Sequence, residues 1–242
     1  MAEGKKDEDR EPGTSRHGNF INYYKFHPAD ERVRQLPRGV WQLRNSDRKY
    51  SALDVGCNAG ELTIELHKVL KEQLPIETDV QVLGIDLDPI LIERARETCS
   101  NPSINFECLD FFSEDREMVL SDYLKKLKRT EFDVVFCFSI TMWIHLNHGD
   151  EGLVKFLEDI CKVTKVLVIE PQPWKCYRNA SRRMRRSGEE DFPLINKLKL
   201  TGEMEKHVER IVCGEKHGFH QIITTGDNNW GRKILIFERK EL

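Results

Sequence analysis

Three aspartates lie at the ends of three successive apolar runs in the chain. They are Asp54 in residues 51–55, Asp86 after residues 80–85, and Asp110 after residues 104–109. If the runs are parallel strands, their carboxyl ends meet at one edge of a sheet and the carboxylates converge. A carboxylate accepts hydrogen bonds from both ribose hydroxyls, and Asp110 followed by Phe111 suits an adenine amine and ring. The spacing therefore predicts a nucleoside pocket.

The turn after the first run narrows the choice of cofactor. It lacks the G-x-G-x-x-G pattern of dinucleotide-binding proteins, because Asn58 stands at the third position, and no Gly-Lys-Ser/Thr follows as in a phosphate-binding loop. What remains is D-x-G-x-x-x-G, which resembles the cofactor turn of class I S-adenosylmethionine (SAM) methyltransferases. In that turn, Gly56 permits close backbone approach to a ligand. An ordinary strand–glycine–helix turn remains the alternative.

The two aspartates of the second turn have different expected roles. Asp88 followed by Pro89 is typical of the N-cap and first residue of a helix. We therefore favour Asp86 as the ribose acceptor and Asp88 as the cap. The alternative is that Asp86 is a solvated turn residue.

The acceptor side carries no familiar catalytic motif. The segment after residues 132–138 lacks an Asn/Asp-Pro-Pro-Tyr motif, and no cysteine stands in a catalytic pattern. Trp174 follows Glu170-Pro171-Gln172-Pro173, which predicts either a rigid aromatic wall or a packed loop.

A basic run without any acid covers residues 175–188. Its cations are Lys175, Arg178, Arg182, Arg183, Arg185 and Arg186. Because the run directly follows a predicted strand end, we favour a phosphate-binding face beside the predicted pocket over a solvated helix or a localisation signal. The aromatic and polar segment 18–28 shows no strand or helix periodicity. It is interpreted as an arm over the cofactor and acceptor, or else as a loop on the sheet edge.

The elements that must position these residues alternate along the chain. Apolar runs at 51–55, 80–85, 104–109, 132–138 and 166–169 predict strands, with helices between them. Residues 221–225 and 233–237 predict an antiparallel hairpin. The expected fold is α/β: a single doubly wound, mostly parallel seven-stranded sheet of Rossmann-like type, ending in that hairpin.

Composition excludes several classes of protein. The net charge is −3, from 38 basic and 41 acidic residues, and no apolar run is long enough to cross a membrane. Seven cysteines without a C-x-x-C pair predict a reduced, cytoplasmic protein without a structural metal. Residues 1–16 are expected to be a disordered tail and 17–242 one domain, which we expect to be monomeric.

Five segments together resemble the bicoid-interacting family of RNA 5′-phosphate methyltransferases. They are Gly18-Asn19-Phe20 with Tyr23-Tyr24, residues 54–58, 84–88, 143–150 and 170–174. Within that family the chain most resembles the branch that acts on 5′-monophosphates. Met142 replaces the lysine of capping relatives, and the missing cation fits an acceptor with fewer phosphates. The resemblance implies SAM as donor and RNA 5′ ends as acceptors, among them precursor microRNA and histidine tRNA. It therefore implies roles in microRNA processing and tRNA modification.

The resemblance also assigns individual residues. Arg32 matches the arginine at the SAM carboxylate, and Asn58 matches the residue that contacts the methionine part of SAM. Asp86 matches the ribose acid, Asp110 and Phe111 match the adenine site, and Phe138 matches a backbone contact. Tyr23, Tyr24 and His27 lie where the arm meets cofactor and phosphate.

A terminal phosphate can react without a general base. Its second pKa is about 6, so one oxygen is already anionic at pH 7. We expect Tyr23, His27 and His145 to hold the phosphate by hydrogen bonds. The alternative for His145 is a structural histidine that caps a helix near residue 148.

Overall fold

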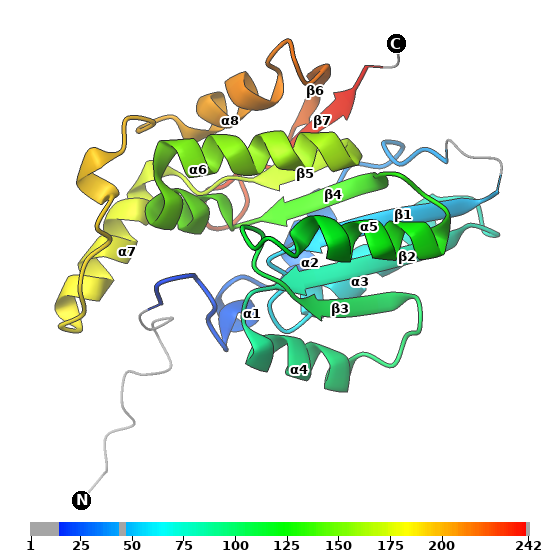
Figure 1. Ribbon diagram of the computed structural model, residues 1–242, viewed down its shortest axis with the longest axis horizontal. Helices are drawn as coiled ribbons and strands as arrows, with labels where there is room; N and C mark the ends of the chain where they lie inside the picture. Colours follow the sequence, from blue (N-terminus) through cyan, green and yellow to red (C-terminus); the bar gives the residue numbers. More distant parts are fainter. Residues whose placement is uncertain (1–14, 44–46, 241–242) are drawn as a thin grey trace, which may run out of the picture.

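The computed structural model describes residues 15–43 and 47–240 of the chain. Its strands form one seven-stranded sheet in the order β3-β2-β1-β4-β5-β7-β6 (Figure 1). The strands are β1 Lys49–Val55, β2 Asp79–Asp86, β3 Ile104–Cys108, β4 Phe132–Phe138, β5 Thr164–Glu170, β6 Phe219–Thr224 and β7 Leu235–Arg239. All neighbours are parallel except β7, which is antiparallel to both β5 and β6. The predicted doubly wound sheet with a C-terminal antiparallel hairpin is confirmed.

Helices cover both faces of the sheet. They are α1 Tyr23–Phe26, α2 Ala29–Gln35, α3 Glu61–Gln73, α4 Pro89–Thr98, α5 Arg116–Leu127, α6 Thr141–Val163, α7 Trp174–Arg186 and α8 Met204–Val212, with a 3-10 turn η2 at Ile195–Lys197. In Figure 1, α5 and α6 lie in front of the strands, and α2 and α3 lie behind them. One apolar cluster joins α5, α6 and α8 to the sheet, and a second joins α3 to its other face. All seven residues of β4 are buried, as expected for a central parallel strand.

The N-terminal segment differs from expectation. Residues 18–28 show no regular periodicity in the sequence, yet they contain α1, and Pro28 serves as the N-cap of α2. Proline is tolerated at a helix start because the first backbone N–H groups have no partner there. Residues 1–14 of the predicted tail lie outside the described residues, whereas Ser15 and Arg16 form hydrogen bonds with the rest of the chain.

The register of the parallel strands decides which side chains reach their carboxyl ends. Asp54 of β1 lies opposite Gly84, which is two residues before the end of β2 at Asp86. Phe138, the last residue of β4, lies opposite Glu170, the last of β5. The strand ends therefore gather Asp86, Phe138 and Glu170 at one edge and leave Asp54 deeper in the sheet. Within the described ranges, no helix is both long and apolar enough to cross a membrane.

Candidate active site

A cavity of about 800 Å³ opens at the carboxyl ends of β1, β2, β3 and β4, and is here called the strand-end cavity. Its lining includes the predicted cofactor residues Gly56, Asn58, Asp86, Asp110, Phe111 and Phe138. Ligands of open α/β sheets bind at this place.

Asp86 is held in place by the backbone of two neighbouring turns. One carboxylate oxygen accepts from the Asn58 N–H at 2.9 Å, and the other accepts from the Asp88 N–H at 3.0 Å. The side chain is 9% exposed, so Asp86 is not a solvated turn residue. Burial raises the pKa of its carboxyl above the usual value. Asp88 accepts from the backbone of Ile90 and caps α4, as predicted.

The far end of the strand-end cavity is aromatic. Asp110 accepts from the Phe112 N–H at 2.9 Å, and Phe111 packs edge-on against Phe156 with ring centroids 4.8 Å apart. Phe112 stacks on His148 at 3.9 Å, and both rings line the cavity. The sequence reasoning missed this pair, although Phe112 directly follows the predicted Phe111.

The turn after β1 allows the backbone to line the cavity. Gly56 has φ +78°, and a Cβ built there would lie 2.3 Å from the Ile140 side chain. Asn58 has φ +52°, and its side-chain amide donates to the Phe20 carbonyl at 3.1 Å. Asn58 therefore fastens the N-terminal segment to the turn as well as lining the cavity.

Asp54, Tyr24 and Arg32 were predicted at the cofactor but do not line the strand-end cavity. Asp54 accepts from the Thr63 hydroxyl at 2.7 Å on the α3 side, and burial raises the pKa of its carboxyl to about 6. The Tyr24 hydroxyl donates to the Cys57 carbonyl at 3.3 Å. Arg32 is fully buried in an ion cluster described below. The expectation that all three strand-end aspartates share one cavity is therefore wrong for Asp54.

Residues 15–20 form a strap along the strand-end cavity, and His17, Gly18 and Asn19 line it. On one side, the Asn19 amide donates to Asp88 at 2.6 Å. On the other side, the Asn147 amide donates to the Arg16 carbonyl at 2.9 Å. Gly18 lies so close to Trp143 that a Cβ would meet its indole at 2.2 Å. The strap is thus fastened at both sides of the cavity.

A second cavity of about 790 Å³ adjoins the first and is here called the cationic cavity. Lys175, Arg183 and Arg232 line it, together with Phe20, Tyr23, His27, Ser139, Met142, Trp143, Gln172, Cys176, Asn179 and Trp230. The two cavities have Tyr23, Ser139 and Trp143 in common. These three side chains form the common wall of the two cavities.

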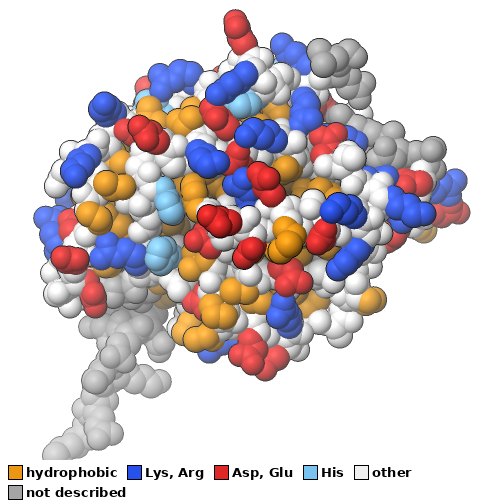
Figure 2. Space-filling view, in the orientation of Figure 1, with side chains coloured by type: hydrophobic (Ala, Val, Ile, Leu, Met, Phe, Trp, Pro, Cys, Tyr) orange, Lys and Arg blue, Asp and Glu red, His pale blue; other side chains and the backbone are white. Residues whose placement is uncertain are grey.

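The predicted basic run forms α7, and its residues divide into two groups. Lys175, Asn179 and Arg183 are spaced by four, lie on one helix side and line the cationic cavity. Arg178, Arg182, Arg185 and Arg186 are exposed. Arg185 pairs with Asp191 at 3.5 Å. Elsewhere, Figure 2 shows basic and acidic side chains interspersed over one face of the molecule, in keeping with the nearly balanced charge.

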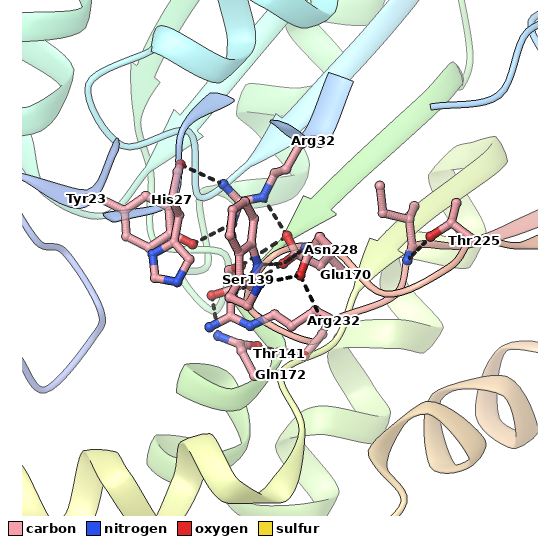
Figure 3. A network of polar contacts seen from close by, with 12 residues as sticks. Tyr23, His27, Arg32, Ser139, Thr141, Glu170, Gln172, Thr225, Asn228 and Arg232 are labelled. Carbon is pink, nitrogen blue, oxygen red and sulfur yellow. Dashed lines mark hydrogen bonds and ion pairs between the residues drawn. The ribbon is translucent and has the colours of Figure 1, made fainter. Parts of the chain in front are cut away.

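A buried ion cluster supports the wall between the cavities (Figure 3). Arg32 Nε donates to Glu170 Oε2 at 2.5 Å, and Arg232 Nη1 lies 3.4 Å from Glu170 Oε1. The Ser139 hydroxyl accepts from Arg32 at 2.8 Å and from Arg232 at 2.5 Å. Although burial alone raises the pKa of Glu170, the two guanidinium groups outweigh it and lower the pKa below its usual value. Ser139 has φ +56°, an uncommon backbone conformation that functional sites often retain.

His27 lies in the cationic cavity as a neutral imidazole. Burial, together with the charges of Arg232 and Arg32, lowers its pKa to about 4. Its ring stacks on Tyr23 at 5.0 Å and meets Trp230 edge-on at 4.9 Å. The predicted phosphate residues Tyr23 and His27 are therefore brought together.

His145 is not brought to either cavity. It lies inside α6, where Trp143, Ile144, Asn147 and His148 form the side that lines the strand-end cavity. Position 145 points elsewhere, and its ring nitrogens contact the Tyr177 hydroxyl at 3.1 Å and Asp150 at 2.8 Å. With no exposed surface, His145 is a structural histidine, and our expectation that it holds the phosphate does not fit this geometry.

Ser139, Gln172, Trp230 and Arg232 were missed as site residues by sequence reasoning. Trp230 and Arg232 lie in the loop between β6 and β7, more than 200 residues from the arm that they meet. Their only local signal is a tryptophan and an arginine beside a glycine in a predicted turn. Across residues 15–43 and 47–240, no group of three or more His, Cys, Asp or Glu side chains is placed to hold a metal ion.

Comparison with known proteins places this geometry in context. A family model described as bicoid-interacting protein 3 matches residues 132–239, and a methyltransferase domain model matches residues 52–166. The chain is 39% identical to an RNA 5′-monophosphate methyltransferase of Bos taurus, over 96% of this chain and 83% of that one. It is 39% identical to a pre-miRNA 5′-monophosphate methyltransferase of Xenopus laevis, over 94% of each chain.

A solved structure shares the fold. A SAM-dependent methyltransferase from Methanosarcina mazei superposes with a TM-score of 0.50 and 14% identity, over 79% of this chain and 93% of that one. At this level of identity the likeness concerns the fold alone.

Proposed function

This chain belongs to the family of RNA 5′-monophosphate methyltransferases, and on that premise we propose that it transfers a methyl group from SAM to the 5′-terminal monophosphate of small RNAs. Precursor microRNA, the RNA in the name of the Xenopus relative, is the first substrate to test, and histidine tRNA the second. The observation that carries the proposal is the common wall of Tyr23, Ser139 and Trp143 between a nucleoside-type cavity and a cationic one.

The residues of the strand-end cavity fit SAM. Gly56 lets the backbone turn pass close to Ile140, where any Cβ would clash, and the Asp86 carboxylate keeps lone pairs free for ribose hydroxyls. Asp110 would accept from the adenine amine, with Phe111 and Phe112 against the ring. When bound, SAM supplies an electrophilic methyl group on a positively charged sulfur.

The residues at the common wall then need to orient a nucleophile rather than to activate it. The second pKa of a terminal phosphate is about 6, so the attacking oxygen is already anionic at pH 7. The Tyr23 hydroxyl accepts from Arg32 at 2.7 Å, which leaves its own hydrogen to donate to a phosphate oxygen. Neutral His27 can hold the phosphate without adding charge beside the reacting oxygen. Trp143 and Phe20 exclude water from the wall, which strengthens these contacts.

A methyl-transfer assay tests the proposal. The protein and methyl-labelled SAM are incubated with one RNA hairpin in three forms: 5′-monophosphate, 5′-hydroxyl and 5′-triphosphate. We expect label only on the monophosphate, and mass spectrometry then shows whether one or two methyl groups are added. Binding of SAM and RNA without transfer to any form would instead indicate a non-catalytic RNA-binding protein. Label on protein or small molecules, with none on RNA, would indicate a different acceptor.

We further propose that the protein acts as a monomer in the cytoplasm. All seven cysteines are free, as suits a reducing compartment. Light scattering of the purified protein and fractionation of cells test these two statements separately.

A further inference from the structure

We propose that Arg232 binds the terminal phosphate directly, through the edge of its guanidinium group formed by Nε and Nη2, with Lys175 as the second cation. This proposal rests on the function proposed above and assigns the residues that recognise the phosphate. Neither residue follows a motif, because they come from the β6–β7 loop and the first turn of α7.

Arg232 has one edge bonded to oxygen atoms of the protein and one edge without an oxygen partner. Its Nη1 donates to Ser139 and Glu170, as described above. Within the described part of the chain, Nε has no hydrogen-bond partner, and the contact of Nη2 is the Cys176 sulfur at 3.9 Å. Sulfur is a weak acceptor, and a buried donor without a partner costs free energy. Arg232 is 8% exposed and lines the cationic cavity, so a ligand in that cavity would lie beside a guanidinium whose donors are not all satisfied.

Arg32 provides the contrast within the same cluster. Its Nε donates to Glu170, its Nη2 to Tyr23 and Ser139, and its Nη1 to the His27 carbonyl at 3.4 Å. Every nitrogen of Arg32 thus has an oxygen partner, and the residue lines neither cavity. Arg32 is a positioning residue for the wall, whereas Arg232 retains binding capacity.

The charge of the cluster favours an anion. Arg32 and Arg232 carry two positive charges against one negative charge on Glu170, and His27 is neutral. The Lys175 ammonium lies beside the loop, since a Cβ built on Gly231 would be 3.1 Å from its Nζ. No carboxylate pairs with Lys175 among the residues described. The net positive charge of Arg232 with Lys175 therefore matches a phosphate dianion.

The geometry also explains how cations can bind the phosphate without slowing methyl transfer. A guanidinium edge binds two oxygens of one phosphate in parallel hydrogen bonds. The third terminal oxygen then remains for the methyl group. Arg232 lines the cationic cavity, and so do Tyr23, Ser139 and Trp143, which also line the strand-end cavity, so a phosphate bound by Arg232 shares a cavity with these three side chains. The cation thus holds the oxygens that do not react.

A binding experiment with matched variants tests the assignment. The affinities of 5′-monophosphate and 5′-hydroxyl forms of one RNA hairpin are measured, and their ratio is compared for wild type, Arg232→Lys and Arg232→Gln. Lysine keeps the charge but lacks the two-pronged edge. We expect the ratio to fall about tenfold or more in both variants, since bonds between a charged donor and phosphate are among the strong ones. The control is Arg94→Gln, an exposed arginine of α4 beside β3, which should leave the ratio unchanged.

Two further measurements separate binding from folding and from the proposed function. SAM affinity, measured by calorimetry, should remain unchanged in Arg232→Lys. If the substitution disrupted the common wall as a whole, SAM affinity would fall as well. If wild type methylates the 5′-monophosphate RNA and both Arg232 variants keep the wild-type binding ratio, the assignment is overturned while the function stands. If wild type binds the 5′-monophosphate selectively but transfers no methyl group, the function fails while a falling ratio in the variants still supports Arg232.

Discussion

Replacing Asp86 by asparagine isolates the predicted ribose contact without changing side-chain volume. Each carboxylate oxygen of Asp86 already accepts one backbone N–H, from Asn58 or from Asp88. A carboxylate offers about four lone-pair sites, so about two remain for the ribose hydroxyls. In Asp86→Asn, the new NH₂ group must face one of these backbone donors, and the negative charge is lost.

The expected loss of SAM affinity follows from these contacts. A hydrogen bond to a charged acceptor contributes about 1.5–3 kcal/mol, so two contribute about 3–6 kcal/mol. At 1.4 kcal/mol per factor of ten, this weakens SAM binding by roughly 10²- to 10⁴-fold. The same loss is expected for S-adenosylhomocysteine, because the ribose is common to both.

Isothermal titration calorimetry with both ligands measures the effect. The matched control is Asp79→Asn, which changes an exposed aspartate at the opposite end of the same strand and should leave affinity unaltered. Circular dichroism establishes that each variant is folded. If folded Asp86→Asn binds SAM within about threefold of wild type, a difference under about 0.7 kcal/mol, the ribose assignment is refuted.

Three other perturbations test separate parts of the site. Burial and the nearby arginines hold the pKa of His27 near 4, so the titration of the phosphate, and not of His27, should set the pH dependence near pH 6. The methyl-transfer rate should fall only below about pH 6, where the phosphate becomes protonated. A pH–rate profile of His27→Gln should keep that inflection. Burial raises the folded-state pKa of Asp54 from 3.8 to about 6, so its contribution to stability is greatest below pH 3.8 and is lost as pH rises through 6. Asp54→Asn should therefore stabilise the protein by about 3 kcal/mol at pH 7.5 and have little effect near pH 4. Denaturant titrations at both pH values measure this difference. Charge reversal of exposed Arg182 and Arg186 should weaken RNA binding and flatten its salt dependence while SAM affinity stays constant, and an unaltered salt slope would make them a solvated face only.

Local patterns were sufficient for the sheet and for much of the strand-end cavity. Apolar runs ending in Asp86 and Asp110 predicted both strands and lining residues, because the lining depends on where a strand stops. Asp54 followed the same pattern but lies one residue before the end of β1, opposite Gly84, and so turns to Thr63 instead. A displacement of one or two residues within a strand cannot be read from one sequence without the register.

The cationic cavity depended on contacts between distant parts of the chain. Arg232 reaches Ser139 because β7 inserts between β5 and β6, an order that the hairpin sequence does not reveal. Arg32 was expected at the cofactor, but its burial follows from pairing with Glu170, 138 residues away. His145 was misplaced for a different reason: the segment after β4 is already helical from Thr141, so residue 145 faces α7 rather than the wall.

The strap formed by residues 15–20 sets a limit on how far the chain can be shortened. His17, Gly18 and Asn19 belong to the cavity lining, although the sheet itself begins only at Lys49. Removing them deletes part of the nucleoside enclosure and the bond to Asp88 without touching a single strand pairing. A protease cut just after Asn19 would remove these lining residues but leave the buried Phe20 in the chain, and the fragment should release its nucleoside faster than the uncut protein.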